Sequence, residues 1–327
     1  MKLSDFDYEL PEHRIAQVPL ADRSSSKLLV VPRDGGPFQH LAFRDLPSLL
    51  SKDDLLVLND TRVTARRLIG KRATGAEVEF LLMHATGPDT YEALVRNAQR
   101  VKADEWVALE GGLEGQILGD AGEGVRQVRL RGDLSGLAHL GTIPLPPYIH
   151  HTLGDEERYQ TTYANHGGSA AAPTAGLHFT PDMLAGLNHT TVTLDVSIDT
   201  FRPVTVDDTR EHVMHGEVCR ISPEAATRIN QRKGRLIAVG TTSVRTLESF
   251  ADQRKVRSGE QKTRIFIEPG YSFQVVDGLI TNFHMPRTTM LLMLAAMIGR
   301  ERLMAAYAEA LERDYRFLSF GDSMLIL

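Results

Sequence analysis

The stretch Arg235–Ala251, RLIAVGTTSVRTLESFA, decides the fold class. Residues 235–240 form a short apolar run that ends in a glycine, which is typical of a buried strand, and residues 243–251 then favour a helix. The same alternation continues through the C-terminal part of the chain. Strands are predicted at 192–198, 263–268, 278–283 and 324–327, and helices at 222–233, 288–299 and 302–313. Strand–helix alternation predicts an α/β fold with a mainly parallel sheet flanked by helices.

The N-terminal residues follow the same pattern. Strands are predicted at 27–32 and 54–58, with a short helix at 43–50 between them. Both ends of the chain therefore contribute to one α/β domain, which we expect to comprise residues 1–60 and 148–327.

The segment between these parts has a different pattern. Short strand candidates separated by Gly- and Asp-containing turns follow one another, and little helix is visible, which favours a small barrel or sandwich. The six candidates are RRLIGKR (66–72), AEVEFLLMH (76–84), YEALVRN (91–97), EWVALE (105–110), GQILG (115–119) and VRQVRLRG (125–132). The Pro-rich PLPPYI (144–149) continues neither a helix nor a ladder and marks a boundary. Residues 61–147 are therefore predicted to form an inserted small β-barrel domain.

Composition limits the class of protein. The 327 residues carry 37 Lys and Arg against 42 Asp and Glu, so a nucleic-acid contact would need a local basic patch. Cys219 is the single cysteine, which excludes an internal disulfide, a zinc ribbon and an iron–sulfur cluster and fits the cytoplasm. The apolar run 290–299 is too short to span a bilayer, and the acidic N-terminus does not fit a signal peptide. No membrane association is expected.

Two segments leave a predicted strand and enter a predicted helix. The first, AVGTTSVR, places Thr241, Thr242 and Ser243 at a helix N-terminus, which could bind an anion or could be an ordinary capped helix start. It matches neither a Walker loop nor GxGxxG, so ATP and dinucleotide binding gain no support. The second, TNFHMPRTT, places Asn282 and His284 at the neighbouring strand end, where His284 could be catalytic or structural.

Three further segments could carry chemistry. GGSAAAPTAGLHFT (167–180) is rich in small residues before His178, which suits close backbone approach to a ligand, or a linker. NDTRV (59–63) places Asp60 directly after a buried strand, as a site residue or as part of a structural ion pair. EHVMHGE (211–217) has two histidines, His212 and His215, at a metal-binding spacing, but the third ligand of a recognisable motif is missing, so the signal is weak.

Basic residues are concentrated in the predicted barrel. Five of them fall within 11 residues that contain no acid: Arg62, Arg66, Arg67, Lys71 and Arg72. Arg96, Arg100 and Lys102 follow, with Trp106 close behind, and a second acid-free run spans 228–235. Charge runs are often only solvated faces, but a positive domain in an acidic chain is also what contact with a phosphate backbone requires.

Long motifs throughout the chain resemble the S-adenosylmethionine:tRNA ribosyltransferase-isomerases of queuosine biosynthesis. They are DFDYELPEHRIAQVPLADRSSSKLLV, LLVLNDTRV, PLPPYI, RYQTTYA, AAPTAGLHFTPDML, MHGE, IAVGTTSVRTLES, FIEPGYSFQVVDGLITNFHMPRTTML and YRFLSFGDSMLI. The resemblance implies an enzyme that transfers and isomerises the ribosyl part of S-adenosylmethionine onto 7-aminomethyl-7-deazaguanine at the tRNA wobble position. Epoxyqueuosine forms, and adenine and methionine leave.

We expect a monomer in the cytoplasm. The resemblance also implies an α/β domain with an inserted β-barrel, and tRNA as partner. It implies no metal and no tightly bound cofactor, with S-adenosylmethionine as co-substrate. The residues expected to be catalytic are His178, His284, Asp60 and His215. Those expected to bind substrate are Thr174, Gly176, Thr241, Thr242, Ser243, Arg245, Asn282 and Asp195. Those expected to bind tRNA are Arg62, Arg66, Arg67, Lys71, Arg72 and Arg100.

Three segments depart from the family pattern. TLDVSIDTF (193–201) stands where the family typically has TLHVGxGTF, so Asp195 replaces a histidine and Ser197 and Asp199 replace glycines. AQR (98–100) replaces a basic SKR, and after MHGE the chain reads VCR (218–220) in place of an aromatic pair. These departures leave an alternative function open: a divergent paralogue that binds S-adenosylmethionine or RNA without this reaction.

Overall fold

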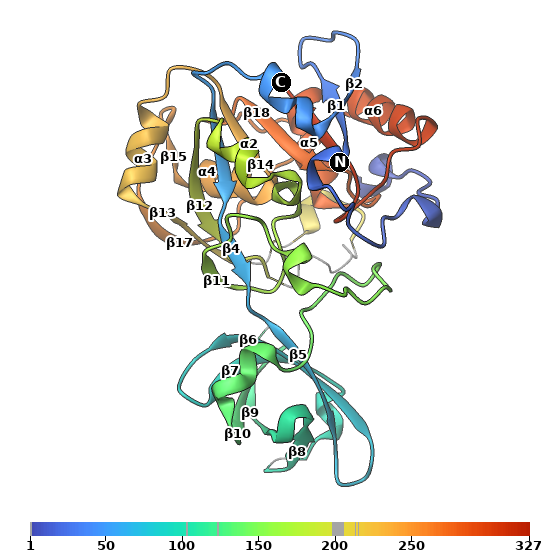
Figure 1. The fold of residues 1–327 in the computed structure, drawn as a ribbon, viewed down its shortest axis with the longest axis vertical. Helices are drawn as coiled ribbons and strands as arrows, with labels where there is room; N and C mark the ends of the chain where they lie inside the picture. Colours follow the sequence, from blue (N-terminus) through green and yellow to red (C-terminus); the bar gives the residue numbers. More distant parts are fainter. Residues whose placement is uncertain (1, 103, 123, 198–205, 213, 215) are drawn as a thin grey trace. The chain divides into compact units, whose positions relative to one another are not determined.

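A computed structural model describes residues 2–327 except 103, 123, 198–205, 213 and 215 (Figure 1). The chain divides into two compact units. The first comprises Met1–Thr61, Pro146–His166 and Ala172–Leu327, and the second comprises Arg62–Leu145 and Gly167–Ala171. The predicted domain boundaries near residues 60 and 148 stay a prediction.

The first unit contains a nine-stranded sheet among the described residues. Its strands, in spatial order, are β17 (Gly259–Thr263), β13 (Glu217–Ile221), β12 (His189–Leu194), β3 (Leu55–Asn59), β14 (Leu236–Val239), β18 (Gly278–Asn282), β19 (Ser323–Ile326), β1 (Lys27–Val31) and β2 (Gln39–Ala42). β12, β3, β14 and β18 are parallel neighbours, and β19 and β1 are parallel to each other. The pairs β17–β13, β13–β12, β18–β19 and β1–β2 are antiparallel.

The sheet is therefore mixed, and the mainly parallel arrangement predicted from the sequence is not confirmed. The reason is clearest at β1 and β2. Only a short turn around Asp34 and Gly35 joins them, and a parallel pair needs a crossover of a dozen or more residues. Strand–helix alternation describes the centre of the sheet but not its edges.

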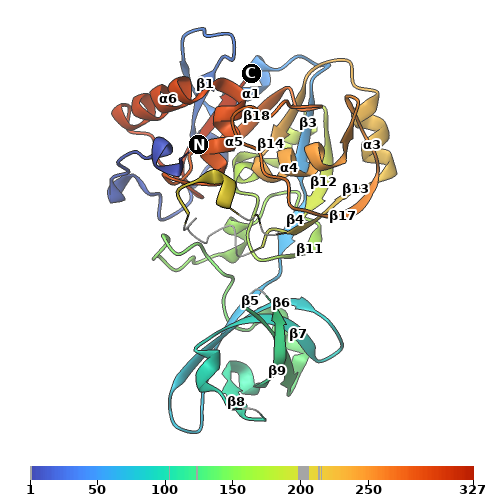
Figure 2. The same cartoon turned by 180° about the vertical axis from the view of Figure 1, so that it is seen from behind.

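Both faces of the central strands are covered, which explains why their sequences read as continuous apolar runs. On one face, alternate residues such as Leu56 and Leu58 of β3 pack with Phe179 and with α1 (Leu46–Leu49) and α2 (Pro181–Ala185). α4 (Thr241–Phe250) packs against β12 and β14, and α3 (Pro223–Asn230) against β12 (Figure 2). The remaining helices are α5 (Thr289–Ile298) and α6 (Arg300–Glu312), which pack together.

One predicted strand is wrong. The apolar residues 263–268 were expected to be a strand, but β17 is the polar GEQKT segment Gly259–Thr263, which pairs with β13 along its whole length. Ile267 is buried outside the ladder. Cross-strand pairing overrides the local apolar pattern here, since strand preference depends on neighbours.

The second unit contains a closed barrel of six strands, so the predicted inserted β-barrel fold is present. The strands are β5 (Arg66–Lys71), β6 (Glu77–Ala85), β7 (Thr90–Arg96), β8 (Trp106–Leu109), β9 (Glu114–Gly122) and β10 (Val125–Arg131). Inward-facing residues such as Leu68, Phe80, Val107 and Val128 form its core.

Two small sheets lie outside the nine-stranded sheet and the barrel. One pairs β4 (Thr61–Val63) with β11 (His166–Ser169), and the other, in the first unit, pairs β15 (Ala251–Asp252) with β16 (Lys255–Val256).

Candidate functional site

One edge of the nine-stranded sheet gathers most of the residues singled out in the first unit. β12, β3, β14 and β18 all end at this edge, because they run in parallel. The residues that directly follow them are Asp195, Asp60, Gly240 and Phe283. The carboxyl ends of parallel strands are the usual ligand-binding edge of an α/β sheet. We call this the carboxyl edge.

The side chain of Asn59 fixes the carboxyl edge between β3 and β12. Its Nδ2 donates to the Leu194 carbonyl at 3.0 Å, and its Oδ1 accepts from the Leu194 N–H at 3.0 Å and the Thr61 N–H at 3.2 Å. Asn59 is fully buried. Its amide therefore continues the ladder after the main chain of β3 has turned away, and so places Asp60 and Asp195 beside each other.

Asp60 lies buried at the centre of this edge. Its Oδ1 accepts from Thr193 Oγ1 at 2.7 Å, and its Oδ2 lies 3.1 Å from His166 Nδ1. Burial and the nearby charge of Asp60 raise the pKa of Tyr163. Among the described residues nothing binds the buried Tyr163 hydroxyl, which lies directly over Gly176. A carboxylate and a neutral phenol thus lie near the glycine of the predicted loop.

Asp195 is a member of a chain of polar contacts. Its Oδ1 accepts from Thr61 Oγ1 at 3.1 Å, and its Oδ2 binds Arg220 Nη1 at 2.9 Å. Arg220 also binds Glu260 through Nε at 2.6 Å. The Asp195 N–H donates to the Val218 carbonyl at 3.0 Å. Two of the three departures from the family pattern are therefore neighbours in space, and a cation neutralises the new carboxylate. Asp199 lies outside the described residues.

Arg245, one turn into α4, forms a buried ion pair with Glu217. Its Nη1 donates to Glu217 Oε2, and Glu217 Oε1 accepts from the Ser197 N–H at 3.1 Å. The Arg245 residue is 8% exposed, yet its Nε and Nη2 have no hydrogen-bond partner in the part of the chain that the structure describes. Each unpaired buried donor costs about 1–3 kcal/mol, so this position carries an energetic cost.

The three hydroxyl side chains predicted at the start of α4, those of Thr241, Thr242 and Ser243, have different environments. Ser243 donates to the Val239 carbonyl, at the end of β14, at 2.7 Å. Thr242 Oγ1 is buried and has no partner among the described residues. The backbone enters the helix through Gly240, whose φ of 87° is one that residues other than glycine rarely adopt. Thr241 is partly exposed at the first helical position. Thr242 is therefore the hydroxyl best placed to meet a ligand at this helix N-terminus.

His178 lies farther along the same edge and is fully engaged by the protein. Its Nδ1 lies 2.7 Å from Ser26 Oγ, and its Nε2 lies 3.2 Å from Asn282 Oδ1. Asn282 in turn donates to the Leu318 carbonyl, and Phe43 stacks on the imidazole ring at 4.9 Å between centroids. Burial lowers the pKa of His178 to about 4. The ring is therefore neutral near pH 7, with both nitrogens occupied.

A small cavity adjoins His178. Its volume is about 20 Å³ for water-sized molecules, enough for about one water. It is lined by Pro19, Leu20, Arg23, Ser26, Arg158, Leu177, His178, Ser319, Phe320 and Gly321. Arg23 donates to the Gln160 carbonyl at 2.9 Å, and burial lowers its pKa. All the residues that line this cavity belong to motifs on which the family resemblance rests.

His284 occupies a different environment. Its Nε2 lies 2.8 Å from Thr281 Oγ1, its N–H donates to Tyr307 Oη at 3.0 Å, and its carbonyl accepts from Tyr8 Oη. Burial lowers the pKa of His284 to about 4. No contact in the described residues joins it to Asp60. His215 lies outside the described residues, and His212 Nε2 lies 3.2 Å from Met214 Sδ.

The basic residues of the barrel are less available than their sequence indicates. Arg67 Nε lies 3.2 Å from Glu79 on the neighbouring strand, and both Nε and Nη2 of Arg72 bind Glu105 at 2.8 Å. The hydrogen bond from Arg72 lowers the pKa of Glu105 to about 2. The remaining predicted contacts differ in exposure: Arg62 and Arg66 are partly exposed, and Lys71 and Arg100 are exposed.

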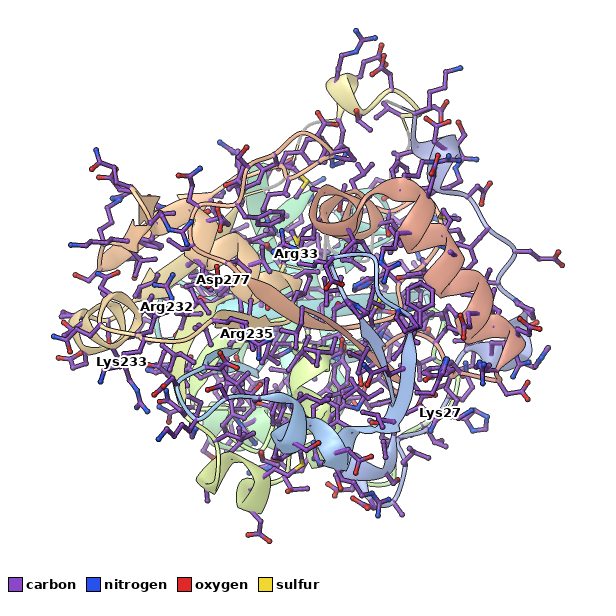
Figure 3. The ribbon with its side chains drawn as sticks, turned by 90° about the horizontal axis from the view of Figure 1, so that it is seen from above. Lys27, Arg33, Arg232, Lys233, Arg235 and Asp277 are labelled. Carbon is purple, nitrogen blue, oxygen red and sulfur yellow. The ribbon has the colours of Figure 1, made fainter. Side chains whose placement is uncertain are left out.

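The second basic run lies at the opposite edge of the sheet. Arg235 binds Asp54 at 2.6 Å, and Arg232 lies 3.9 Å from Asp277. Figure 3 shows Arg232, Arg235 and Asp277 gathered there, with Lys233 farther out. Carboxylates that precede β3 and β18 thus balance this run.

Two kinds of feature are absent from the described part of the chain. There, no three His, Cys, Asp or Glu side chains gather as metal ligands. Within the same residues, none of the helices has the length and apolar character needed to cross a membrane.

Sequence reasoning missed four residues of this edge: Tyr163, His166, Glu217 and Arg220. Tyr163 and Glu217 lie within the motifs RYQTTYA and MHGE, so the resemblance contained a signal for them. His166 lies outside these motifs, and Arg220 belongs to the VCR departure, but the sequence does not link either residue to Asp60 or Asp195, because only the paired strands bring them together.

Known proteins match the chain along its length. The profile of the family described as "Queuosine biosynthesis protein" covers residues 3–326. An S-adenosylmethionine:tRNA ribosyltransferase-isomerase from Desulfitobacterium hafniense is 48% identical, and one from Symbiobacterium thermophilum is 49% identical, each over the whole of both chains. The chain belongs to the queuosine biosynthesis protein family. A crystal structure of the S-adenosylmethionine tRNA ribosyltransferase from Thermotoga maritima is also similar, with a TM-score of 0.56 and 33% identity over 99% of this chain and 100% of that one.

Substituting Gly176 should disturb the carboxyl edge. A Cβ there would collide with the Tyr163 hydroxyl and lie 2.8 Å from Thr161 Cγ2. We expect Gly176→Ala to lower turnover at least tenfold, because it displaces Tyr163 from its place near Asp60. Gly154→Ala is the matched control, since its Cβ would meet nothing within 4 Å. Initial rates of S-adenosylmethionine consumption with tRNA, measured for both variants, test this prediction. Equal rates for Gly176→Ala and Gly154→Ala would contradict it.

The low pKa of His178 predicts acid sensitivity. The folded protein holds its pKa at about 4, whereas the unfolded chain protonates near 6.5. Unfolding therefore takes up a proton below pH 6.5, and the free energy of unfolding falls as pH drops from about 6.5 to 4, on the order of 3 kcal/mol for such a group. In urea titrations from pH 7.5 to 4.5, the stability gap between wild type and the non-titrating His178→Gln should narrow. A difference in unfolding free energy that stays constant with pH would show that His178 does not cause the acid sensitivity.

Proposed function

We propose that this protein acts as an S-adenosylmethionine:tRNA ribosyltransferase-isomerase. It transfers and isomerises the ribosyl moiety of S-adenosylmethionine onto 7-aminomethyl-7-deazaguanine at the wobble position of tRNA, and epoxyqueuosine, adenine and methionine result. The observation that carries this proposal is the full-length match to relatives of that name at 48% and 49% identity.

The reaction needs a base and a counter-charge for a cation. The sulfonium makes protons on the adjoining 5′ carbon acidic enough for a modest base, and the aminomethyl group must lose a proton before it attacks. We propose Asp60 for both roles, because it is buried and its charge acts on Tyr163, whose hydroxyl has no hydrogen-bond partner among the described residues. We assign proton transfer or cation stabilisation to Asp60.

We assign the histidines positioning roles. Both ring nitrogens of His178 are occupied by Ser26 and Asn282, so His178 and Asn282 would hold the loop that carries Thr174 and Gly176 in place. Substrate would meet that loop rather than the imidazole. His284, with its lowered pKa, would likewise act as a neutral hydrogen-bonding group. His215 remains a candidate from the sequence alone.

Asp195 would act on substrate through Thr61. Both of its oxygens are engaged, by Thr61 and by Arg220, so it is not a free counter-charge for the sulfonium. Its proposed role is to hold Thr61, and with it Asp60, in place. Thr241, Thr242 and Ser243 are proposed as the helix N-terminus that receives an anionic part of the co-substrate, with Thr242 as the side-chain donor.

The barrel is proposed to bind tRNA through Arg62, Arg66, Arg67, Lys71, Arg72 and Arg100. Of these, Lys71 and Arg100 are the most exposed, while the bidentate bond of Arg72 to Glu105 favours a structural contribution. We further propose that the protein works as a cytoplasmic monomer. We propose no tightly bound cofactor, because S-adenosylmethionine is itself consumed in the reaction.

Product analysis tests the function directly. The protein is incubated with S-adenosylmethionine and tRNA that carries 7-aminomethyl-7-deazaguanine, and the digested tRNA is analysed by mass spectrometry. We expect epoxyqueuosine together with free adenine and methionine, and no adenine with unmodified tRNA. S-adenosylhomocysteine as product would mean methyl transfer. Binding of both substrates without product would favour the alternative of a non-catalytic paralogue.

Arginines of the barrel should control the tRNA dependence. We expect Arg66→Ala combined with Arg67→Ala to raise the apparent KM for tRNA several-fold while the KM for S-adenosylmethionine stays unchanged. Each lost phosphate contact should flatten the log–log salt dependence by about one. The matched control replaces Arg126 and Arg129, which lie on the same barrel and pair with Asp120 and Asp89. Equal effects from the two pairs would mean that residues 66 and 67 form only a solvated face.

A further inference from the structure

We propose that Arg245 is the subsite for the α-carboxylate of the methionine part of S-adenosylmethionine, and that Glu217 positions it. The proposal deepens the proposed function and rests on it for the identity of the ligand. Arg245 is 8% exposed, and Glu217 is 2% exposed. The pair thus lies inside the protein at the carboxyl edge and not on a solvated face.

The unpaired atoms of Arg245 define the shape of the ligand. Nη1 is bound to Glu217, whereas Nε and Nη2, which together form the side-on edge of a guanidinium, have no partner among the described residues. Two parallel N–H groups on that edge match the two oxygens of a carboxylate. A buried fork with one arm fixed and its bidentate edge unpaired is suited to a planar anion.

Glu217 holds the guanidinium in one orientation. It begins β13 at the carboxyl edge, and its second oxygen accepts from the Ser197 N–H at 3.1 Å. With both oxygens engaged, its carboxylate is rigid, and rigidity in the supporting group is what keeps a binding fork productive. Glu217 is therefore a positioning residue for Arg245.

The charges at this place favour an amino acid over a phosphate. Arg245 and Glu217 present one positive and one negative group side by side, so a zwitterion can satisfy both: its carboxylate meets Arg245 and its ammonium lies near Glu217. A phosphate dianion would be repelled by Glu217. The N-terminus of α4, with the unpaired Thr242 hydroxyl, adds a second attraction for the carboxylate.

A line of contacts connects this subsite to Asp60. Glu217 binds Ser197, which lies two residues after Asp195, and Asp195 binds Thr61 beside Asp60. The carboxylate subsite and the proposed reacting centre are thus parts of one edge.

Decarboxylated S-adenosylmethionine is the decisive probe, because it keeps the sulfonium and the ammonium and lacks only the carboxylate. Calorimetry, with and without the modified tRNA, gives its Kd and that of S-adenosylmethionine. We expect wild type to bind S-adenosylmethionine at least tenfold more tightly. Arg245→Lys keeps the charge but loses the fork, and should reduce this preference to less than threefold. Glu217→Gln should reduce it in the same direction, because Arg245 loses its positioning partner, and the lost attraction for the ammonium should weaken both probes.

The matched control is Arg232→Lys. Arg232 has a comparably buried side chain, 11% exposed, and lies near Asp277 at the opposite edge (Figure 3). It should leave the preference unchanged, and melting temperatures check that each variant is folded. If Arg245→Lys does not fold, the wild-type comparison still decides: equal binding of the two probes would overturn the proposal.

Two other results would also overturn it. One is an unchanged preference in folded Arg245→Lys. The other is competition of inorganic phosphate with S-adenosylmethionine combined with a loss of tRNA affinity in the variant, which would make the fork a phosphate site. Failure of the proposed function looks different: the preference for the carboxylate would persist in Arg245-dependent form, but no epoxyqueuosine would form.

Discussion

The amide of Asn59 fixes the carboxyl edge of the sheet between β3 and β12. By binding both the N–H and the carbonyl of Leu194, it extends the β3–β12 ladder by one side chain after the backbone of β3 has left it. The backbone consequently leaves the sheet at Asp60 and Thr61, and the Thr61 side chain reaches Asp195. An unpaired buried amide would be costly, so this position tolerates few alternatives. The polar edge is thus built on a hydrogen bond that only a side-chain amide can supply.

Charges along the carboxyl edge are paired, and the unpaired donors stand out against that background. Asp60 has Thr193 and His166, Asp195 has Thr61 and Arg220, and Arg220 has Glu260. Paired groups hold the edge rigid in a medium of low dielectric constant. Nε and Nη2 of Arg245 differ from these groups, because they have no hydrogen-bond partner in the part of the chain that the structure describes.

The sequence predicted those features that depend on local pattern. Six barrel strands follow from alternation and turns, and the gathering of Asp60, Gly240 and Asn282 at one edge follows from parallel strand ends. Features set by distant pairing were not predictable. The polar strand β17 exists because β13 lies beside it. Glu79 and Glu105 reach Arg67 and Arg72 only through the barrel, so a run without acids in the sequence is not one without acids in space.

The departure at Asp195 shows how the carboxyl edge accommodates an additional carboxylate. A carboxylate directly after β12 would repel Asp60 and Glu217 if it stood alone. Arg220 lies on the neighbouring strand, in register with Thr193, and its guanidinium binds Asp195 while Glu260 binds its other side. Arg220 therefore pairs with the added carboxylate, and Thr61 keeps a hydrogen-bond acceptor. Because both oxygens of Asp195 are engaged in this way, the added carboxylate is held within the hydrogen-bond network of the carboxyl edge.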